Sequence, residues 1–146
     1  MLVLDRALVE DLLDPGALVD AVAAAMADLS AGRASVPDRV GAFVPQRGVL
    51  GAMPGYVPSS GILMAKLVSL FPGNTALPTH QAVIAVFDPA TGRPDALLDG
   101  TAITALRTAA GSALSVRLLA RRDAHELAIL GTGVQARSHA AAVCRE

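Results

Sequence analysis

The 146-residue sequence predicts an α+β domain over residues 1–122, followed by the first β-α unit of a second, α/β domain over residues 123–146. Two changes of pattern support this division. Short β-like apolar runs predominate between Val40 and Leu98, whereas apolar residues recur at helical spacing from Ala102 to Ala120. A polar break, Arg121–Asp123, then precedes a new apolar run, a glycine-rich turn and a second helical stretch.

The first predicted element is an amphipathic helix that begins at Pro15. Asp14 is a favourable N-cap residue, and proline is well tolerated at the first helical position. Apolar residues follow at helical spacing, and the pattern ends near Gly32, as expected for one face packed on a core. These residues are Leu18, Val19, Val22, Ala23, Met26 and Leu29.

The central part predicts a mainly antiparallel sheet. The turn Pro45–Gly48 has hairpin chemistry, and the dense turn formers of Asp88–Pro94 are expected to join two further strands. The predicted strands are Val40–Val44, Val49–Met53, Ile62–Leu70, Ala82–Phe87 and Ala96–Leu98.

Composition and charge exclude several function classes. The formal net charge is −1, which leaves no basic footprint for nucleic acid. No apolar run approaches the roughly 20 residues that cross a bilayer, and the first residues do not resemble a secretory signal, so we expect no membrane partner. The single cysteine, Cys144, fits a reducing cytoplasm. The three histidines, His80, His125 and His139, lack metal-ligand spacing, so no metal site is predicted.

Lysine usage singles out one residue. Among the 12 Lys and Arg residues, Lys66 is the only lysine. An ammonium can lose its proton and act as a compact donor, which a guanidinium cannot do. A role specific to lysine and simple chance retention both remain open at this point.

The segment after residue 123 carries the motif with the clearest chemistry. Glu126–Leu130 has strand character, the run Gly131–Ala136 has the pattern G-x-G-x-x-A, and Arg137–Arg145 is helical in pattern. Gly131 permits a tight turn, and Gly133 lets backbone N–H groups approach a pyrophosphate at a helix N-terminus. The segment therefore predicts the start of a Rossmann-like domain that binds NAD or NADP, although an ordinary strand-to-helix turn has the same pattern. The position that would distinguish the two cofactors lies beyond Glu146.

Six runs together resemble the ornithine cyclodeaminase/mu-crystallin family, in their order as well as in their residues. The combination of the helix motif at 105–110 with the glycine-rich turn is far more specific than either alone. The runs are Lys66–Asn74, Leu77–Gln81, Phe87–Pro94, Leu98–Thr101, Ile103–Ala110 and Gly131–Ala136.

The resemblance implies an NAD(P)-dependent enzyme that interconverts small amino acids with imino or keto acids. In this family the first domain binds substrate and forms a homodimer, and the second is a Rossmann domain. The resemblance implies that Arg39, Lys66 and Arg107 surround the substrate carboxylate, with Lys66 also catalytic. It places the remaining site residues against the cofactor: Gln81, Arg107, Thr108, Gly131, Thr132, Gly133, Val134 and Gln135.

Two departures from the family bear on activity. Ornithine-specific members carry a glutamate two residues before a Met-Pro pair, where this chain has Gly51 before Met53. Members are also about twice as long, so we expect an incomplete chain that is inactive alone, because a dinucleotide site needs two βαβ halves. A nonenzymatic dimer that binds a small ligand, and a simple interaction domain in which the three basic residues are surface charges, are the alternatives.

Overall fold

The computed structural model describes residues 1–146 and contains one six-stranded sheet and four helices. The strand order is β1-β6-β5-β4-β3-β2. The neighbouring strands are antiparallel except β1 and β6, which are parallel. In chain order the elements are β1 (Leu2–Leu4), α1 (Arg6–Leu12), α2 (Pro15–Ser30), β2 (Val40–Val44), β3 (Gly48–Val57), β4 (Ile62–Leu70), β5 (His80–Phe87), β6 (Pro94–Asp99), α3 (Gly100–Leu119) and α4 (Val134–Val143).

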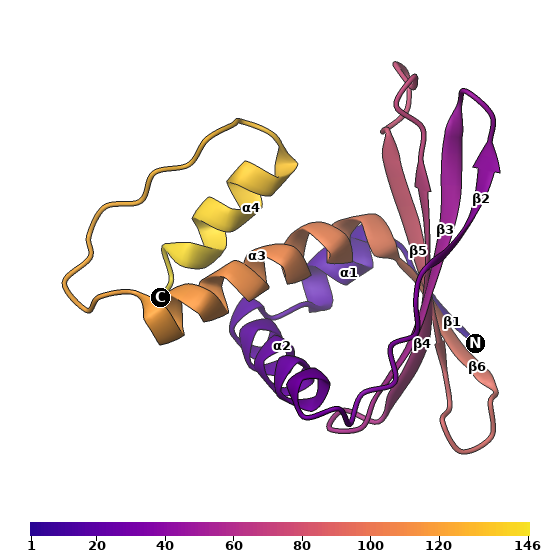
Figure 1. The fold of residues 1–146 in the computed structure, drawn as a ribbon, viewed down its shortest axis with the longest axis horizontal. Coiled ribbons are helices and arrows are strands. Elements are labelled where there is room, and N and C mark those ends of the chain that lie inside the picture. Colours follow the sequence, from indigo (N-terminus) through magenta and orange to yellow (C-terminus); the bar gives the residue numbers. More distant parts are fainter.

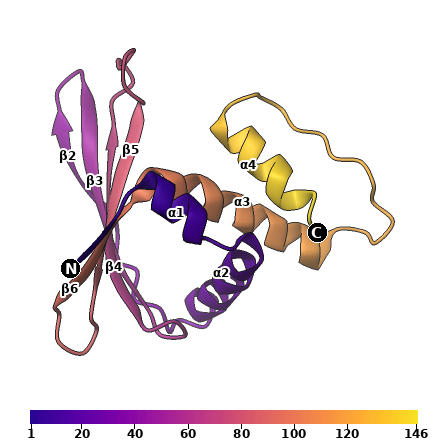
Figure 2. The ribbon, with the colours of Figure 1, turned by 180° about the vertical axis from the view of Figure 1, so that it is seen from behind.

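All four helices lie on one side of the sheet (Figure 1). The long helix α3 starts at the sheet and runs away from it, with α2 and α4 packed along it. Figure 2, from behind, shows that no helix covers the opposite face of the sheet. None of the helices combines the length and the apolar character needed to cross a bilayer.

The predicted antiparallel strands are confirmed, with small changes at their ends. β2 and β3 form a hairpin in which Val44 pairs with Gly48, and Gln46 in the turn has a positive φ of 59°. β3 continues four residues past the predicted end, to Val57. It pairs along its length with β4, whose predicted bounds are correct.

Two short N-terminal elements are absent from the sequence-based prediction. β1 has only three residues, too few for an alternating pattern, and it joins the sheet by pairing with β6 more than 90 positions away. α1 is held at its start by Asp5, whose carboxylate accepts a hydrogen bond from Leu8 N–H at 3.0 Å. The parallel pairing of β1 with β6 makes the predicted antiparallel sheet a mixed one.

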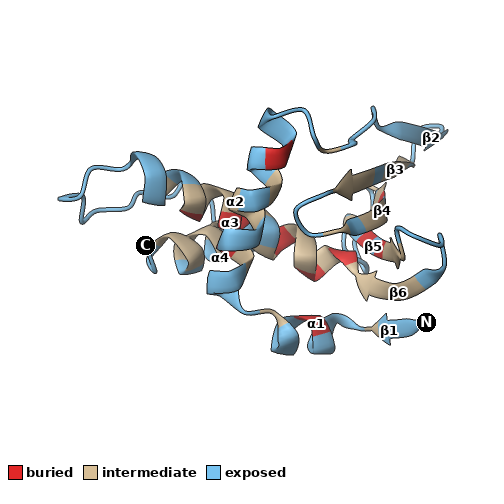
Figure 3. Cartoon of the chain, turned by 90° about the horizontal axis from the view of Figure 1, so that it is seen from below, coloured by how far each residue is buried: buried red, intermediate tan, exposed pale blue.

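The core lies where α2 and α3 pack together. Small residues on α3 allow close approach, and Ala110 and Ala113 pack with Val19 of α2 while being at most 4% exposed. Both helices have the side-chain caps that their sequences suggest, from Asp14 and Asp99. Only 12 of 146 residues are buried, so much apolar surface stays accessible, including the outer parts of the sheet (Figure 3).

The predicted strand at Glu126–Leu130 is wrong for this structure. The segment belongs to an irregular connection between α3 and α4, and Leu130 is 101% exposed. A strand of this type requires neighbouring strands to hydrogen-bond with its backbone, and the six-stranded sheet offers none at this place. The helix that follows is confirmed, although it begins at Val134 instead of Arg137.

A buried carboxylate ties the end of α2 to the sheet. Asp28 is 3% exposed and accepts hydrogen bonds from Ser59 N–H at 2.8 Å and from Arg33 Nε at 2.9 Å. The bonds from Ser59, and then the guanidinium of Arg33, hold the pKa of Asp28 below its ordinary value. Two residues beyond Arg33, Ser35 pairs with Tyr56 of β3. This contact fixes the path of the segment that leads to Arg39.

We expect Asp28→Asn to lower the melting temperature by several degrees at pH 7, because one amide cannot accept all the hydrogen bonds of the carboxylate. A lowered folded-state pKa means that the stabilisation is complete above the unfolded pKa and is lost as pH falls through the folded value. The difference between wild type and variant, followed by circular dichroism, should therefore shrink in acid. Asp11→Asn, on the exposed side of α1, is the control; an equal loss there would contradict the assignment.

Candidate functional site

Lys66 lies in the middle of the sheet and points toward the helices. It occupies the centre of β4, between Met53 of β3 and Ile84 of β5. Its side chain is half-buried, and the ammonium donates a hydrogen bond to Thr104 Oγ1 of α3 at 3.4 Å. The only lysine of the chain is therefore placed at the junction between the sheet and α3.

Two arginines act on this ammonium. Burial lowers the pKa of Lys66, and the charges of Arg107 and then Arg39 lower it further. Arg107 projects from α3 and Arg39 precedes β2, and both are exposed. The fold therefore brings two sequence-distant arginines within electrostatic range of Lys66.

None of the three cations has an acidic partner. Six ion pairs occur in the structure, and none involves Arg39, Lys66 or Arg107. Like charges held together raise the free energy of the empty site, and an anion would relieve that repulsion. Guanidinium groups bind carboxylates with two parallel hydrogen bonds, so the arrangement suits a small carboxylate.

The sheet beside Lys66 is apolar. Gly51 pairs with Val68, and a Cβ at Gly51 would lie 3.5 Å from a methyl group of that valine. Met53 pairs with Lys66 itself. The residues beside the ammonium on β3 thus provide no carboxylate.

A cavity of about 550 Å³ opens at the start of α3. Its walls come from α1, through Arg6 and Glu10, from residues 78–80 at the start of β5, from the first turns of α3 and from the N-terminal part of α4. Thr104 is one of the lining residues of α3. Three residues of the predicted cofactor loop also line it: Gly133, Val134 and Gln135. Thr104 therefore touches both this cavity and the Lys66 ammonium.

The glycine-rich turn has the geometry expected at an anion site. Gly131 has a φ of 106°, and Gly133 is the N-cap of α4 with no side chain capping the helix. A Cβ at Gly133 would meet nothing within 4 Å. The first N–H groups of α4 are thus open to an external acceptor, which fits a dinucleotide pyrophosphate.

Two other predicted cofactor residues lie apart from this cavity. Gln81 lines a separate cavity of about 480 Å³ whose walls include Leu50, Leu67 and Val83. Thr108 is half-buried and donates its hydroxyl hydrogen to the carbonyl of Thr104 at 2.6 Å. The cofactor roles of both residues stay predictions.

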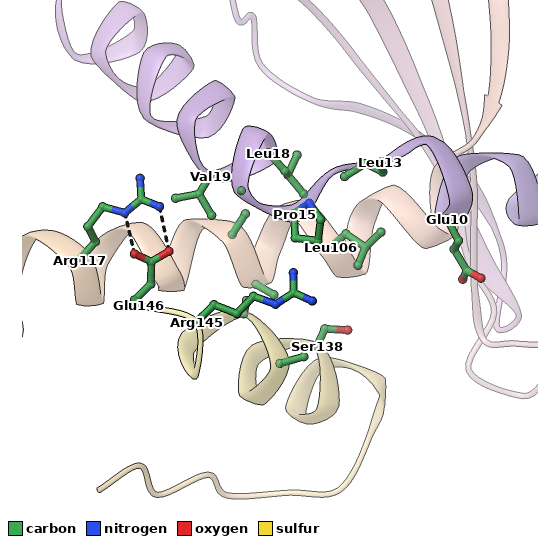
Figure 4. Close-up of a pocket in the computed structure, with 15 residues that line it drawn as sticks. Glu10, Leu13, Pro15, Leu18, Val19, Leu106, Arg117, Ser138, Arg145 and Glu146 are labelled. Atoms are coloured by element: carbon green, nitrogen blue, oxygen red, sulfur yellow. Dashed lines mark hydrogen bonds and ion pairs between the residues drawn. The ribbon is translucent and has the colours of Figure 1, made fainter. Parts of the chain in front are cut away.

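A third space, of about 400 Å³, separates α4 from the helices beneath it (Figure 4). It contains none of the predicted site residues. At one end Arg117 forms two hydrogen bonds with Glu146, of 2.6 and 2.9 Å, and one with Asp20 of 2.8 Å. These ion pairs hold the end of α4 beside α3 and α2.

A family model matches the chain from residue 1 to residue 146, and it describes the ornithine cyclodeaminase/mu-crystallin family. The chain belongs to this family. The resemblance inferred from the sequence motifs is therefore confirmed.

The relatives of this ornithine cyclodeaminase/mu-crystallin family chain include several oxidoreductases. Mouse ketimine reductase mu-crystallin is 44% identical over 128 residues, which cover 84% of the chain and 41% of that protein. A Thermococcus litoralis Δ1-pyrroline-2-carboxylate reductase, solved with NADH and L-proline, has a TM-score of 0.92 at 42% identity. An archaeal alanine dehydrogenase dimer with bound NAD has a TM-score of 0.93 at 33% identity.

These matches also show how much of a family member the chain contains. The two solved structures match 99% of the chain, while the chain covers 46% of the reductase and 45% of the dehydrogenase. The chain therefore spans less than half the length of these relatives.

Thr104 is the site residue that the sequence analysis missed. It lies three positions before Arg107, one helical turn away, so both side chains project from neighbouring positions of α3. A hydroxyl residue one turn before the predicted carboxylate-binding arginine was the available signal. The structure contains no cluster of three or more potential metal-binding side chains.

Arg107→Gln should raise the pKa of Lys66, because it removes the like charge that has the larger effect on the ammonium. Arg39→Gln should raise it less. Since Lys66 is the only lysine, 13C-labelled lysine gives one Cε signal, whose NMR titration measures the pKa directly. Arg122→Gln is the control, and an equal rise in this variant would mean that Arg107 has no specific effect.

Proposed function

We propose that this chain forms the substrate-binding part of an NAD(P)-dependent oxidoreductase that interconverts a small amino acid with its imino acid. The observation that carries the proposal is the group of three cations, without acidic partners, at the junction of β4 and α3. The relatives named above include a ketimine reductase and a Δ1-pyrroline-2-carboxylate reductase, whose substrates are imines.

In this proposal Arg39 and Arg107 bind the substrate carboxylate. Arg39 precedes Lys66 in the sequence and Arg107 follows it, but the charges of both arginines lower the pKa of the same ammonium. A carboxylate between them would orient the neighbouring α-carbon and its nitrogen toward Lys66. Orientation of this kind contributes to catalysis by replacing a bimolecular encounter with a fixed geometry.

Lys66 would serve as the group that gives or takes a proton at the substrate nitrogen. Burial and the two arginines bring its pKa down from the ordinary lysine value, so the ammonium releases its proton more readily than an exposed lysine. NADH or NADPH supplies the hydride when bound. The apolar surroundings of Met53 and Val68 would limit the access of water to the ammonium.

We propose that residues 1–122 form the substrate-binding and dimerisation domain and that residues 123–146 begin the dinucleotide-binding domain. The pyrophosphate of NAD or NADP would lie at the start of α4, held by Gly131, Thr132, Gly133, Val134 and Gln135. The uncapped helix N-terminus supports this assignment.

Ornithine cyclodeamination is disfavoured by the position of Gly51. A substrate with a distal ammonium needs a carboxylate near the substrate site, and β3 offers none beside Val68 and Lys66. We therefore propose a substrate without a distal ammonium.

A nonenzymatic dimer that binds a small carboxylate without turnover is the second candidate. It is favoured by the same unpaired cations, which attract an anion whether or not a reaction follows. Carboxylate binding without NAD(P)H-dependent reduction, in a chain completed by the missing half of a relative, would support this candidate over the first.

L-proline should bind to the 146-residue chain, whereas L-prolinamide should bind much more weakly because it lacks the carboxylate. Arg39→Gln and Arg107→Gln should each reduce L-proline affinity by about 10-fold or more, since a charge-assisted hydrogen bond contributes roughly 1.5–3 kcal/mol. The change of the Lys66 Cε signal as each ligand is added measures the affinity for L-proline and for L-prolinamide. Equal binding of L-proline and L-prolinamide would contradict the proposed carboxylate site.

Gly133→Val should weaken NADH binding by about 10-fold or more in a chimera that joins residues 1–146 to the remaining half of the T. litoralis reductase. A Cβ at this position would meet no protein atom within 4 Å, so we expect the fold to tolerate the substitution. The new side chain would occupy the space needed by a pyrophosphate. Fluorescence titration gives the affinity. Gly111→Ala, in the middle of α3, is the control, and unchanged NADH affinity in Gly133→Val would remove this assignment.

We further propose that a second copy of the chain covers the face of the sheet that has no helices. Successive strand residues point to opposite faces, so Leu67 points away from Lys66 and the helices. Leu67 and its cross-strand partner Val83 are each 40% exposed, and Leu50 on the neighbouring strand is 47% exposed. The dimeric archaeal alanine dehydrogenase supports the proposal.

Leu67→Asp should convert the dimer to a monomer, because it places a charge in the centre of this apolar face. Sedimentation equilibrium measures the mass directly. Leu119→Asp is the control, since Leu119 is 83% exposed at the far end of α3. A dimer that persists in Leu67→Asp would show that the copies meet elsewhere.

A further inference from the structure

The hydroxyl group of Thr104 has a fixed direction. Its oxygen lies 2.6 Å from the carbonyl oxygen of Gly100, which can only accept, so the hydroxyl hydrogen points to that carbonyl. The Lys66 ammonium can only donate, and it approaches the same oxygen at 3.4 Å. The hydrogen bonds therefore run in one direction, from Lys66 through Thr104 to Gly100.

The hydrogen bond to Gly100 alone does not indicate a special role for Thr104. Thr and Ser residues in helices often donate to the carbonyl four residues earlier, and Thr108, Ser115 and Ser138 do so in this chain. Thr104 differs from these three because its oxygen also accepts from a charged side chain on the sheet.

The first turn of α3 holds Thr104 in place. Gly100 is buried, and a Cβ there would lie 3.0 Å from backbone and side-chain atoms of Ala82. Thr101 adds a hydrogen bond, in which its hydroxyl oxygen accepts from Ala82 N–H at 3.0 Å. Since β5 neighbours β4, the acceptor of Lys66 is fixed relative to the strand that carries the lysine.

The ammonium needs such an acceptor because its other neighbours repel it. Arg107 and Arg39 both disfavour the charged form of Lys66, and no carboxylate lies within ion-pair distance. Thr104 is its one hydrogen-bond partner in the structure. The hydroxyl thus opposes the repulsion that would otherwise drive the flexible lysine side chain away from the arginines.

We propose that Thr104 is a positioning residue that holds the Lys66 ammonium beside the cavity lined by Thr104 and by residues 133–135. The role in catalysis rests on the proposed function, whereas the contact itself does not. The 3.4 Å separation is long for a hydrogen bond, so Thr104 guides the ammonium and leaves it free to approach a bound carboxylate.

The test is the titration of the single 13Cε lysine signal in the 146-residue chain. Thr104→Val keeps the shape but removes the acceptor, so the pKa of Lys66 should fall below the wild-type value. Thr104→Ser should restore it, because serine retains the oxygen. Thr108→Val, the same change one turn later, should leave the Lys66 titration unchanged.

A Lys66 titration that is the same in Thr104→Val and in wild type would overturn the proposal, as would an equal shift in Thr104→Ser. If Thr104→Val fails to fold, as judged by circular dichroism, Thr104→Ala removes the same oxygen and is judged by the same outcomes. No ligand is needed for these measurements. Failure of L-proline to bind would therefore reject the proposed function, while the titration would still decide the role of Thr104.

Discussion

The contact between Gly100 and Ala82 determines where α3 leaves the sheet, and the candidate site depends on that position. A Cβ at Gly100 would lie 3.0 Å from backbone and side-chain atoms of Ala82, so any larger residue would push α3 away from β5. Asp99 caps the helix immediately before this contact, accepting from Ala102 N–H at 2.7 Å. The helix consequently starts against the sheet with a fixed rotation. This rotation brings Thr104 into contact with Lys66, and it brings Arg107 within electrostatic range of the same ammonium.

This arrangement keeps Arg39 and Arg107 within electrostatic range of Lys66, and none of the three cations has an acidic ion-pair partner. A salt bridge at Lys66 would relieve the repulsion but would also occupy the place where a carboxylate ligand could bind. The chain has several arginines that are paired, among them Arg33 with Asp28 and Arg117 with Glu146. Arg47, Arg122, Arg137 and Arg145 are also unpaired, so the absence of an ion pair alone does not set Arg39 and Arg107 apart. What distinguishes them is that their charges act on the half-buried Lys66 ammonium, which favours a binding role over a structural one.

Local patterns predicted most elements, and non-local pairing explains what they missed. The cap at Asp14 identified the start of α2, the apolar spacing identified α2 and α3, and the turn-forming residues identified the antiparallel strands. β1 depends on a partner far along the chain, so three residues gave no signal. Glu126–Leu130 gave a strand signal without a partner. Similarly, Lys66 and Arg107 were predicted from motifs, but the contact of Lys66 with Thr104 joins residues 38 positions apart.

The two faces of the sheet have different proposed functions: the face under the helices binds the ligand, and the open face binds a second copy of the chain. Along β4, Lys66 and Val68 point toward the helices, and Leu67 between them points to the open face. A second copy packed against Leu67 would therefore stiffen the strand that carries Lys66 without contacting the ligand. On the other face, α3 contacts β4, β5 and α4, so it connects the lysine to the glycine-rich turn. Because substrate and cofactor residues both depend on this one helix, a shift of α3 would alter the carboxylate site and the Gly131 turn together.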